Sequence, residues 1–76
     1  MNIFRRIRQH FENHRKAEEA EDFSRGYDFA AGALLRGEET PFTLVAKIWT
    51  RDSFDDGILK AIDRLVSAGI VIDDRI

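Results

Sequence analysis

The chain has 76 residues and a mass of 8.8 kDa, which suits one small domain and excludes an enzyme with separate substrate and cofactor lobes. Apolar residues make up 43% of the sequence and charged residues 34%, and the formal net charge is -2, a mixture typical of a soluble globular protein rather than a disordered one. Because the sequence contains no cysteine, disulfide bonds and thiolate metal sites are excluded, and we expect an intracellular, cytoplasmic protein.

Residues 1–22 are predicted to form an amphipathic helix that changes from basic to acidic along its length. Its apolar residues recur at spacings of three and four, which is typical of one helix face, and they are Ile3, Phe4, Ile7 and Phe11. Residues 1–16 hold five cations and one carboxylate, hence a net charge of +4, which leaves -6 for residues 17–76. The sequence therefore predicts a basic head on an acidic body.

Residues 23–76 are predicted to form a compact helical body, and its first helix runs from Phe23 to a stop at Gly37. Small residues at helical spacing favour the close approach of a neighbouring helix, and they are Gly26, Ala30, Ala33 and Gly37, or alternatively Ala31 with Gly32. Because glycine weakens a helix, we expect any break in a single long N-terminal helix near residues 24–26.

A second helix is predicted from Pro41 to about Thr50, with Thr40 as its N-cap and proline at the first helical position. The spacing of its apolar residues predicts one buried face with Leu44 beside it, and the face consists of Phe42, Val45, Ile48 and Trp49. The Thr-Pro pair marks the clearest boundary in the sequence.

A third helix is predicted to begin at Asp52 or Ser53 and to end at Gly69. Its apolar stripe repeats at spacings of four, four and three, and consists of Phe54, Ile58, Ile62 and Leu65. Residues 70–72 are read as an extended tail, because a lone strand has no evident partner. The fold class is thus all-α: a small domain of three to four helices with a long N-terminal helix and a short extended C-terminal tail.

No pattern of residues predicts a catalytic or metal site. His10, His14 and Glu18 lie four residues apart, but zinc needs further ligands that the chain does not supply. The segment from Asp52 to Asp63 resembles a calcium loop only until its third position, where Phe54 provides no oxygen ligand. We therefore expect a protein that is not an enzyme and needs no cofactor or metal.

Membrane insertion and secretion are not expected either. No apolar run approaches the ~20 residues that a membrane-spanning helix needs. The N-terminal arginines are not followed by the apolar stretch of a secretory signal peptide.

One segment carries a resemblance to a known group of proteins. The sequence R-G-Y-D-F-A-A-G-A-L-L-R-G-E of residues 25–38, followed by Thr40 and Pro41, resembles the central motif of small proteins encoded by tailed phages and prophages. The resemblance implies an accessory phage protein that works in the cytoplasm of a bacterial host. Phage proteins of this size often bind and block a host machine, as anti-CRISPR proteins do, and the resemblance assigns no role to any single residue.

The leading interpretation is a phage-type inhibitor that binds a host protein complex by occupying one of its surfaces. A basic, nucleic-acid-binding target surface would be contacted by acidic residues, namely Glu18, Glu19, Glu21, Asp22, Glu38, Glu39, Asp55 and Asp56. The apolar stripe of the first helix is expected to pair two copies into a homodimer, through Ile3, Phe4, Ile7 and Phe11.

Two other interpretations stay open. The protein is a nucleic-acid or membrane-surface adaptor if its basic head contacts phosphates or anionic lipid, through Arg5, Arg6, Arg8, Arg15 and Lys16. It is a structural or assembly module if it forms a stable oligomer and has no host partner.

Overall fold

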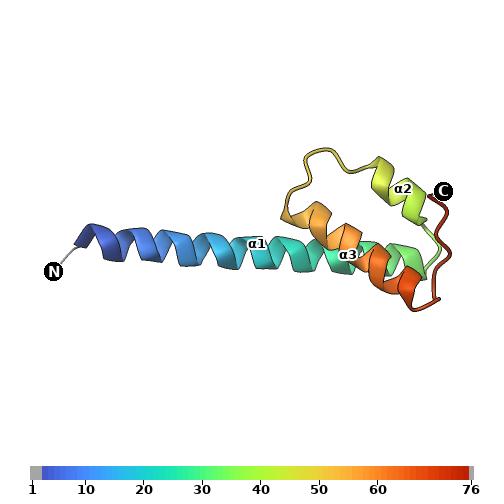
Figure 1. Cartoon of the computed structure of the whole chain (residues 1–76), viewed down its shortest axis with the longest axis horizontal. Helices are drawn as coiled ribbons and strands as arrows, with labels where there is room; N and C mark the ends of the chain where they lie inside the picture. Colours follow the sequence, from blue (N-terminus) through green and yellow to red (C-terminus); the bar gives the residue numbers. More distant parts are fainter. Residues whose placement is uncertain (1–2, 76) are drawn as a thin grey trace.

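The computed structural model describes the backbone of residues 3–75 and the side chains of residues 18–75. Over this part of the chain the fold consists of three α-helices and no strand (Figure 1). Helix α1 spans Ile3–Leu35, helix α2 spans Pro41–Ala46 and helix α3 spans Ser53–Ser67. The predicted all-α class and the extended C-terminal tail are therefore confirmed.

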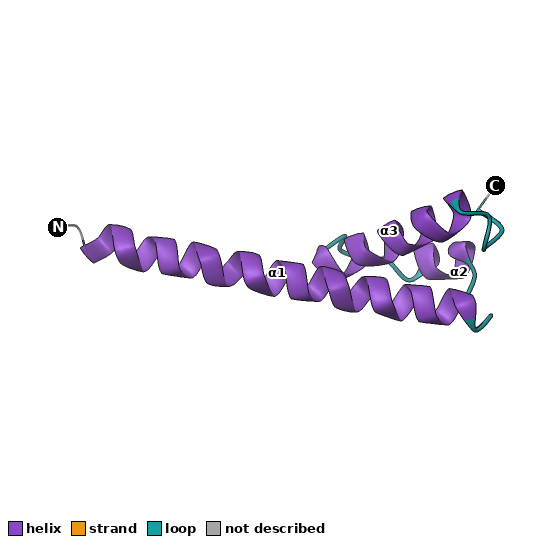
Figure 2. Cartoon of the chain, turned by 90° about the horizontal axis from the view of Figure 1, so that it is seen from below, coloured by secondary structure: helices purple, strands orange, loops and turns teal. Residues whose placement is uncertain are grey.

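Helix α1 is a continuous rod of 33 residues and gives the molecule its elongated shape of 56 × 22 × 18 Å. Both views show α2 and α3 beside the C-terminal half of α1, while the N-terminal half extends beyond them (Figures 1 and 2). The helix passes through residues 24–26, where a kink is predicted, without interruption. The proposed division after residue 22 thus falls inside one helix, near the point where α1 meets the body.

Two glycines allow α1 and α3 to approach each other backbone to backbone. A Cβ atom built on Gly26 would lie 1.9 Å from the carbonyl oxygen of Phe54, and one built on Gly57 would lie 2.0 Å from that of Phe23. Any side chain at either position would overlap the opposite helix. The predicted role of Gly26 in close helix packing is confirmed, and its counterpart on α3 is Gly57.

The core lies along this helix pair and is closed by α2. The buried apolar residues come from all three helices, and they form one cluster of Ala30, Leu34, Leu44, Ile58, Ala61 and Ile62. Further along the two helices, buried alanines at positions 30 and 61 keep α1 and α3 close together. The predicted α3 stripe is confirmed, because Ile58 and Ile62 are buried and Phe54 and Leu65 pack against the same cluster.

The helix ends follow the predicted signals. Gly37 and Gly69 both adopt a left-handed backbone, with φ of 72° and 74°, just beyond the last turns of α1 and α3. Glu38 N–H donates to Ala33 O at 2.9 Å and Ile70 N–H donates to Leu65 O at 3.0 Å, the pairing of a Schellman motif.

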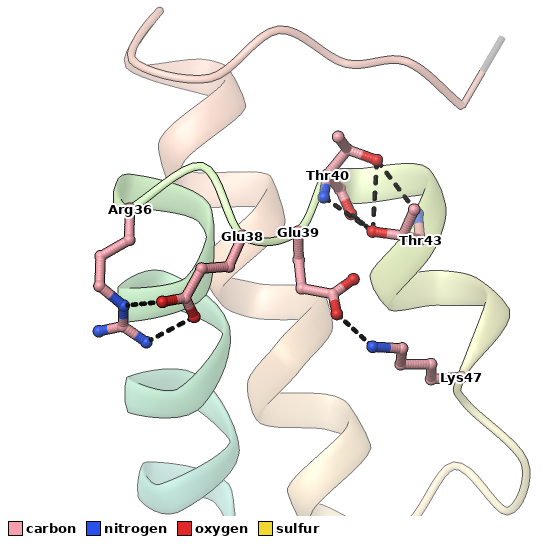
Figure 3. A network of polar contacts seen from close by, with 6 residues as sticks. All are labelled: Arg36, Glu38, Glu39, Thr40, Thr43 and Lys47. Atoms are coloured by element: carbon pink, nitrogen blue, oxygen red, sulfur yellow. Dashed lines mark hydrogen bonds and ion pairs between the residues drawn. The ribbon is translucent and has the colours of Figure 1, made fainter.

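Helix α2 begins with a reciprocal capping box between two threonines. Thr43 N–H donates to the Thr40 hydroxyl oxygen at 3.2 Å, and Thr40 N–H donates to the Thr43 hydroxyl oxygen at 2.8 Å (Figure 3). Pro41 follows at the first helical position and is buried. The predicted start of the second helix is thus confirmed.

The predicted end of α2 is wrong, and its predicted buried face is only partly correct, because Val45 and Ile48 pack against the core but Phe42 and Trp49 do not. The helix ends at Ala46, and Lys47 serves as its C-cap, so residues 48–50 belong to a loop. Leu44 is fully buried, whereas Phe42 is 58% exposed and Trp49 is 91% exposed. Because only one turn and a half of helix forms, the apolar spacing of residues 42–49 no longer defines a single face.

The C-terminal tail is tied to the start of α2. Phe42 N–H donates to the Asp74 carboxylate at 2.8 Å, and hydrogen bonds from the Thr40 side chain and this amide lower the pKa of Asp74. The Arg75 guanidinium donates to both carboxylate oxygens of Asp73 at 2.8 Å, and this contact lowers the pKa of Asp73 to about 2. Asp74 therefore holds the tail against the start of α2, whereas the Asp73–Arg75 pair lies within the tail.

The glycine contact predicts opposite effects for two alanine substitutions. Gly57→Ala should lower the free energy of unfolding by about 3 kcal/mol or more, because the new methyl group forces α1 and α3 apart. Gly32→Ala is the matched control, since its Cβ would meet only the flexible end of Arg36, and it should stabilise the protein by about 0.5–1 kcal/mol. Chemical denaturation followed by circular dichroism measures both. Equal stability of the two variants would contradict the packing described here.

Candidate protein-binding surface

The loop between α2 and α3 presents the only tryptophan of the sequence to the outside. Trp49 borders a shallow hollow of about 430 Å³ between the end of α2, this loop and α3, which is lined by Val45, Ile48, Trp49, Arg51 and Leu59. Val45 and Ile48 also pack against the core, so the floor of the hollow is anchored to the body. The hollow is therefore an apolar surface with one cation among its lining residues.

The backbone at Arg51 is held in an unfavourable conformation. Its φ of 51° places it in the left-handed region, which costs a non-glycine residue about 1–2 kcal/mol. The Arg51 N–H donates to the carboxylate of Asp55 at 3.0 Å, and the N–H of Asp55 donates to the carboxylate of Asp52 at 3.0 Å. These bonds tie the end of the loop, at Arg51, to the first turn of α3.

Asp55 therefore does not belong to the acidic contact residues that we predicted. Its side chain is buried, at 9% exposure, because it points back toward the loop and accepts the Arg51 hydrogen bond. A partner could reach this carboxylate only by breaking the loop. Asp56, the next residue, is exposed on α3 and keeps its place in the predicted set.

Glu38 and Glu39 are already paired within the chain (Figure 3). The Arg36 guanidinium donates to both oxygens of Glu38, at 2.9 and 3.2 Å, and this pairing lowers the pKa of Glu38. Lys47 donates to Glu39, and this hydrogen bond lowers the pKa of Glu39. Their charges are partly neutralised, so they contribute less to attraction of a partner than their number suggests.

The other predicted acidic residues lie where α1 leaves the body. Exposed side chains occupy positions 18–22, and the carboxylates among them are Glu18, Glu19, Glu21 and Asp22. Arg25 pairs with Glu21 at 2.8 Å and more loosely with Asp22 at 3.8 Å. This acidic stretch keeps a net negative charge, and it lies on α1, whereas the hollow is formed by α2, the loop and α3.

Several predicted residues lie outside the described side chains. They are the self-association residues Ile3, Phe4, Ile7 and Phe11 and the basic residues Arg5, Arg6, Arg8, Arg15 and Lys16. The histidines of the rejected metal site, His10 and His14, also lie there. Within the part of the chain with described side chains, no three His, Asp or Glu residues are placed to hold a metal ion.

The sequence pattern does not predict that Trp49 and Arg51 lie together at the surface. Trp49 was assigned to the buried face of a longer second helix, because it continues a spacing of three and four. The run Thr50-Arg51-Asp52-Ser53 directly after it contains three N-cap residue types, which indicate the start of α3 but do not show that α2 ends at Ala46.

Comparisons with protein-family models, with curated proteins and with solved structures gave no match. Among the helices that the structure describes, none is both long enough and apolar enough to cross a membrane.

The role of Asp55 in the loop predicts a specific loss of stability. Asp55→Ala leaves the Arg51 N–H without its acceptor and should lower the free energy of unfolding by about 1–3 kcal/mol. Asp55→Asn keeps an acceptor oxygen and should lose less, and Asp56→Asn, at an exposed position, should change stability by less than about 0.5 kcal/mol. Thermal unfolding gives the ranking. Asp55 has no bracing role if its alanine variant is as stable as Asp56→Asn.

Proposed function

We propose that this protein is a non-enzymatic binding protein that inhibits a bacterial host complex by occupying one of its surfaces. The observation that supports this function best is the 91% exposure of Trp49 beside an apolar hollow. Tryptophan is enriched among the residues that dominate binding energy at protein interfaces. A fixed loop that presents it is suited to recognition of another protein.

The energetic argument rests on the area that Trp49 can bury. A tryptophan side chain buries roughly 150–250 Å² in an interface, and each Å² of apolar surface removed from water contributes about 25 cal/mol. The gross gain is then several kcal/mol, before the losses of association. The hydrogen bond from Arg51 N–H to Asp55 restrains the end of the loop before binding, which reduces part of the entropy cost of association.

The charge of the body supports a basic target. Residues 17–76 carry a net charge of -6, and the exposed acidic stretch on α1 is part of that excess. Complementary charge speeds association and sets orientation more than it adds affinity. Trp49 would therefore supply affinity, and the acidic residues would favour a basic, nucleic-acid-binding partner.

The phage-type context comes from the sequence resemblance of residues 25–38. It supports an accessory protein that acts in the cytoplasm of a bacterial host, with an anti-CRISPR or other counter-defence role as the natural class. Association of two copies through the N-terminal half of α1 belongs to the same proposal, and light scattering on the purified protein tests it.

The extension of α1 beyond the body favours one alternative, an adaptor that uses its basic head (Figure 1). A helix that projects from a folded domain is accessible to a phosphate backbone or an anionic membrane. Steeply salt-dependent binding of RNA, DNA or anionic vesicles would identify the adaptor, provided that it disappears when Arg5, Arg6, Arg8, Arg15 and Lys16 are replaced.

Replacement of Trp49 tests the inhibitor proposal. Tagged protein recovered from a bacterial host should hold a stoichiometric protein partner, and Trp49→Ala should weaken that complex by about tenfold or more. The exposed Trp49 side chain makes a folding defect unexpected, which circular dichroism checks. Ile72→Ala is the control, since Ile72 is 88% exposed and does not line the hollow. If Trp49→Ala retains the partner at the wild-type level, the proposed surface is wrong.

Neutralisation of the acidic stretch tests the electrostatic part. A variant with Glu18→Gln, Glu19→Gln, Glu21→Gln and Asp22→Asn should bind the partner more weakly and lose part of the salt dependence, because each exposed contact is worth up to about 1 kcal/mol. Titrations at low and high salt measure both effects. An unchanged affinity with unchanged salt dependence would show that this stretch does not contact the target.

A further inference from the structure

Arg51 differs from most described arginines in having its charge available beside an apolar surface. Arg25, Arg36 and Arg75 each pair with a carboxylate of the chain within 3.0 Å. Among the described side chains, no carboxylate forms such a pair with Arg51, although Arg51 lines the hollow. Its guanidinium thus keeps donors for a partner, in an otherwise acidic body.

The carboxylates close to Arg51 in the sequence accept backbone hydrogen bonds. Asp52 accepts the N–H of Asp55, and Asp55 accepts the N–H of Arg51. Among the ion pairs of the described side chains, none joins either carboxylate to the guanidinium. Lys47, at the end of α2, is paired with Glu39. Among the residues that line the hollow, Arg51 is the cation, it has no ion pair with a described carboxylate, and its backbone conformation is unfavourable for arginine.

We propose that the hollow between α2 and α3 binds an acidic, apolar segment of the partner protein. One apolar side chain of that segment enters the hollow against Trp49, and a neighbouring carboxylate pairs with Arg51. This inference rests on the proposed function, and it adds the chemistry of the element that the Trp49 surface recognises.

The dimensions and chemistry of the hollow fit this occupant. A volume of about 430 Å³ lies at the lower end of the range of roughly 300–1,000 Å³ for ligand pockets. It offers room for one or two side chains, and its aliphatic lining from Val45, Ile48 and Leu59 supplies no hydrogen-bonding group of its own. A guanidinium at the rim suits a carboxylate, to which it can donate two parallel hydrogen bonds.

A target can satisfy both requirements if it is basic overall and carries one acidic, apolar segment. The body's charge of -6 acts over the whole surface, whereas Arg51 acts only at hydrogen-bonding distance. A purely basic segment at the hollow would face Arg51 and be repelled. The net charge of the body therefore attracts the target over long range, and Arg51 with the hollow recognises one segment of it.

The single tryptophan allows a direct binding test without the natural partner. The probes are three short synthetic peptides with the same leucine and phenylalanine residues, which differ only in flanking glutamate, glutamine or lysine. Titration of the full chain should shift Trp49 emission to shorter wavelength, because the indole leaves water. We expect the glutamate peptide to bind about fivefold more tightly than the glutamine peptide, and the lysine peptide to bind most weakly.

Two arginine variants assign the charge preference. Arg51→Gln should bind the glutamate and glutamine peptides equally, with the affinity of the glutamine peptide unchanged. Arg64→Gln is the matched control, because Arg64 is exposed on α3, does not line the hollow, and should leave the preference intact. If Arg51→Gln weakens both peptides alike, Arg51 only shapes the loop and the proposed pairing is wrong.

The remaining outcomes separate this inference from the proposed function. If no peptide changes Trp49 emission, or if the lysine peptide binds most tightly, the acidic apolar occupant is wrong. A partner that is still lost on Trp49→Ala would then leave the binding function standing. If instead the peptides bind as expected but Trp49→Ala retains the host partner, the local recognition is supported and the proposed inhibitory surface fails.

Discussion

The close approach of α1 and α3 at Gly26 and Gly57 is the constraint on which the rest of the molecule depends. Each glycine admits the backbone of the opposite helix to a distance that any side chain would prevent. At this separation, small residues such as Ala30 and Ala61 fill the space between α1 and α3. The larger buried side chains form one cluster with Leu44 of α2. A chain of 76 residues has little apolar surface to bury, and close helix packing uses it efficiently.

The sequence predicted the parts of this fold that depend on local signals. Thr40 with Pro41, Gly37 and Gly69 each satisfy hydrogen bonds within a few residues, so their roles can be read from the chain alone. The partner of Gly26 could not be identified in this way, because nothing local to Gly57 shows which backbone approaches it. A kink is predicted near Gly26 because glycine has a low helix propensity. Packing against α3, which the sequence does not show, compensates for that low propensity.

The candidate surface was harder to predict than the fold. Periodicity assigned Trp49 to a buried face, and it could not register that α2 ends after Ala46. Asp55 was read as a surface charge, because a sequence shows that a carboxylate is present but does not show the backbone amide that it accepts. That amide belongs to Arg51, whose positive φ has no sequence signature of the kind that glycine provides.

The continuous helix α1 also determines how far its N-terminal half extends from the body. The segment of residues 3–22 rises by roughly 30 Å, so the basic head is held at a set distance from the loop of Trp49. A flexible tether samples many separations, whereas a helical backbone restricts them. A target could bind both regions at once only if its two complementary sites have a matching spacing. This requirement on spacing does not depend on the affinity of either site.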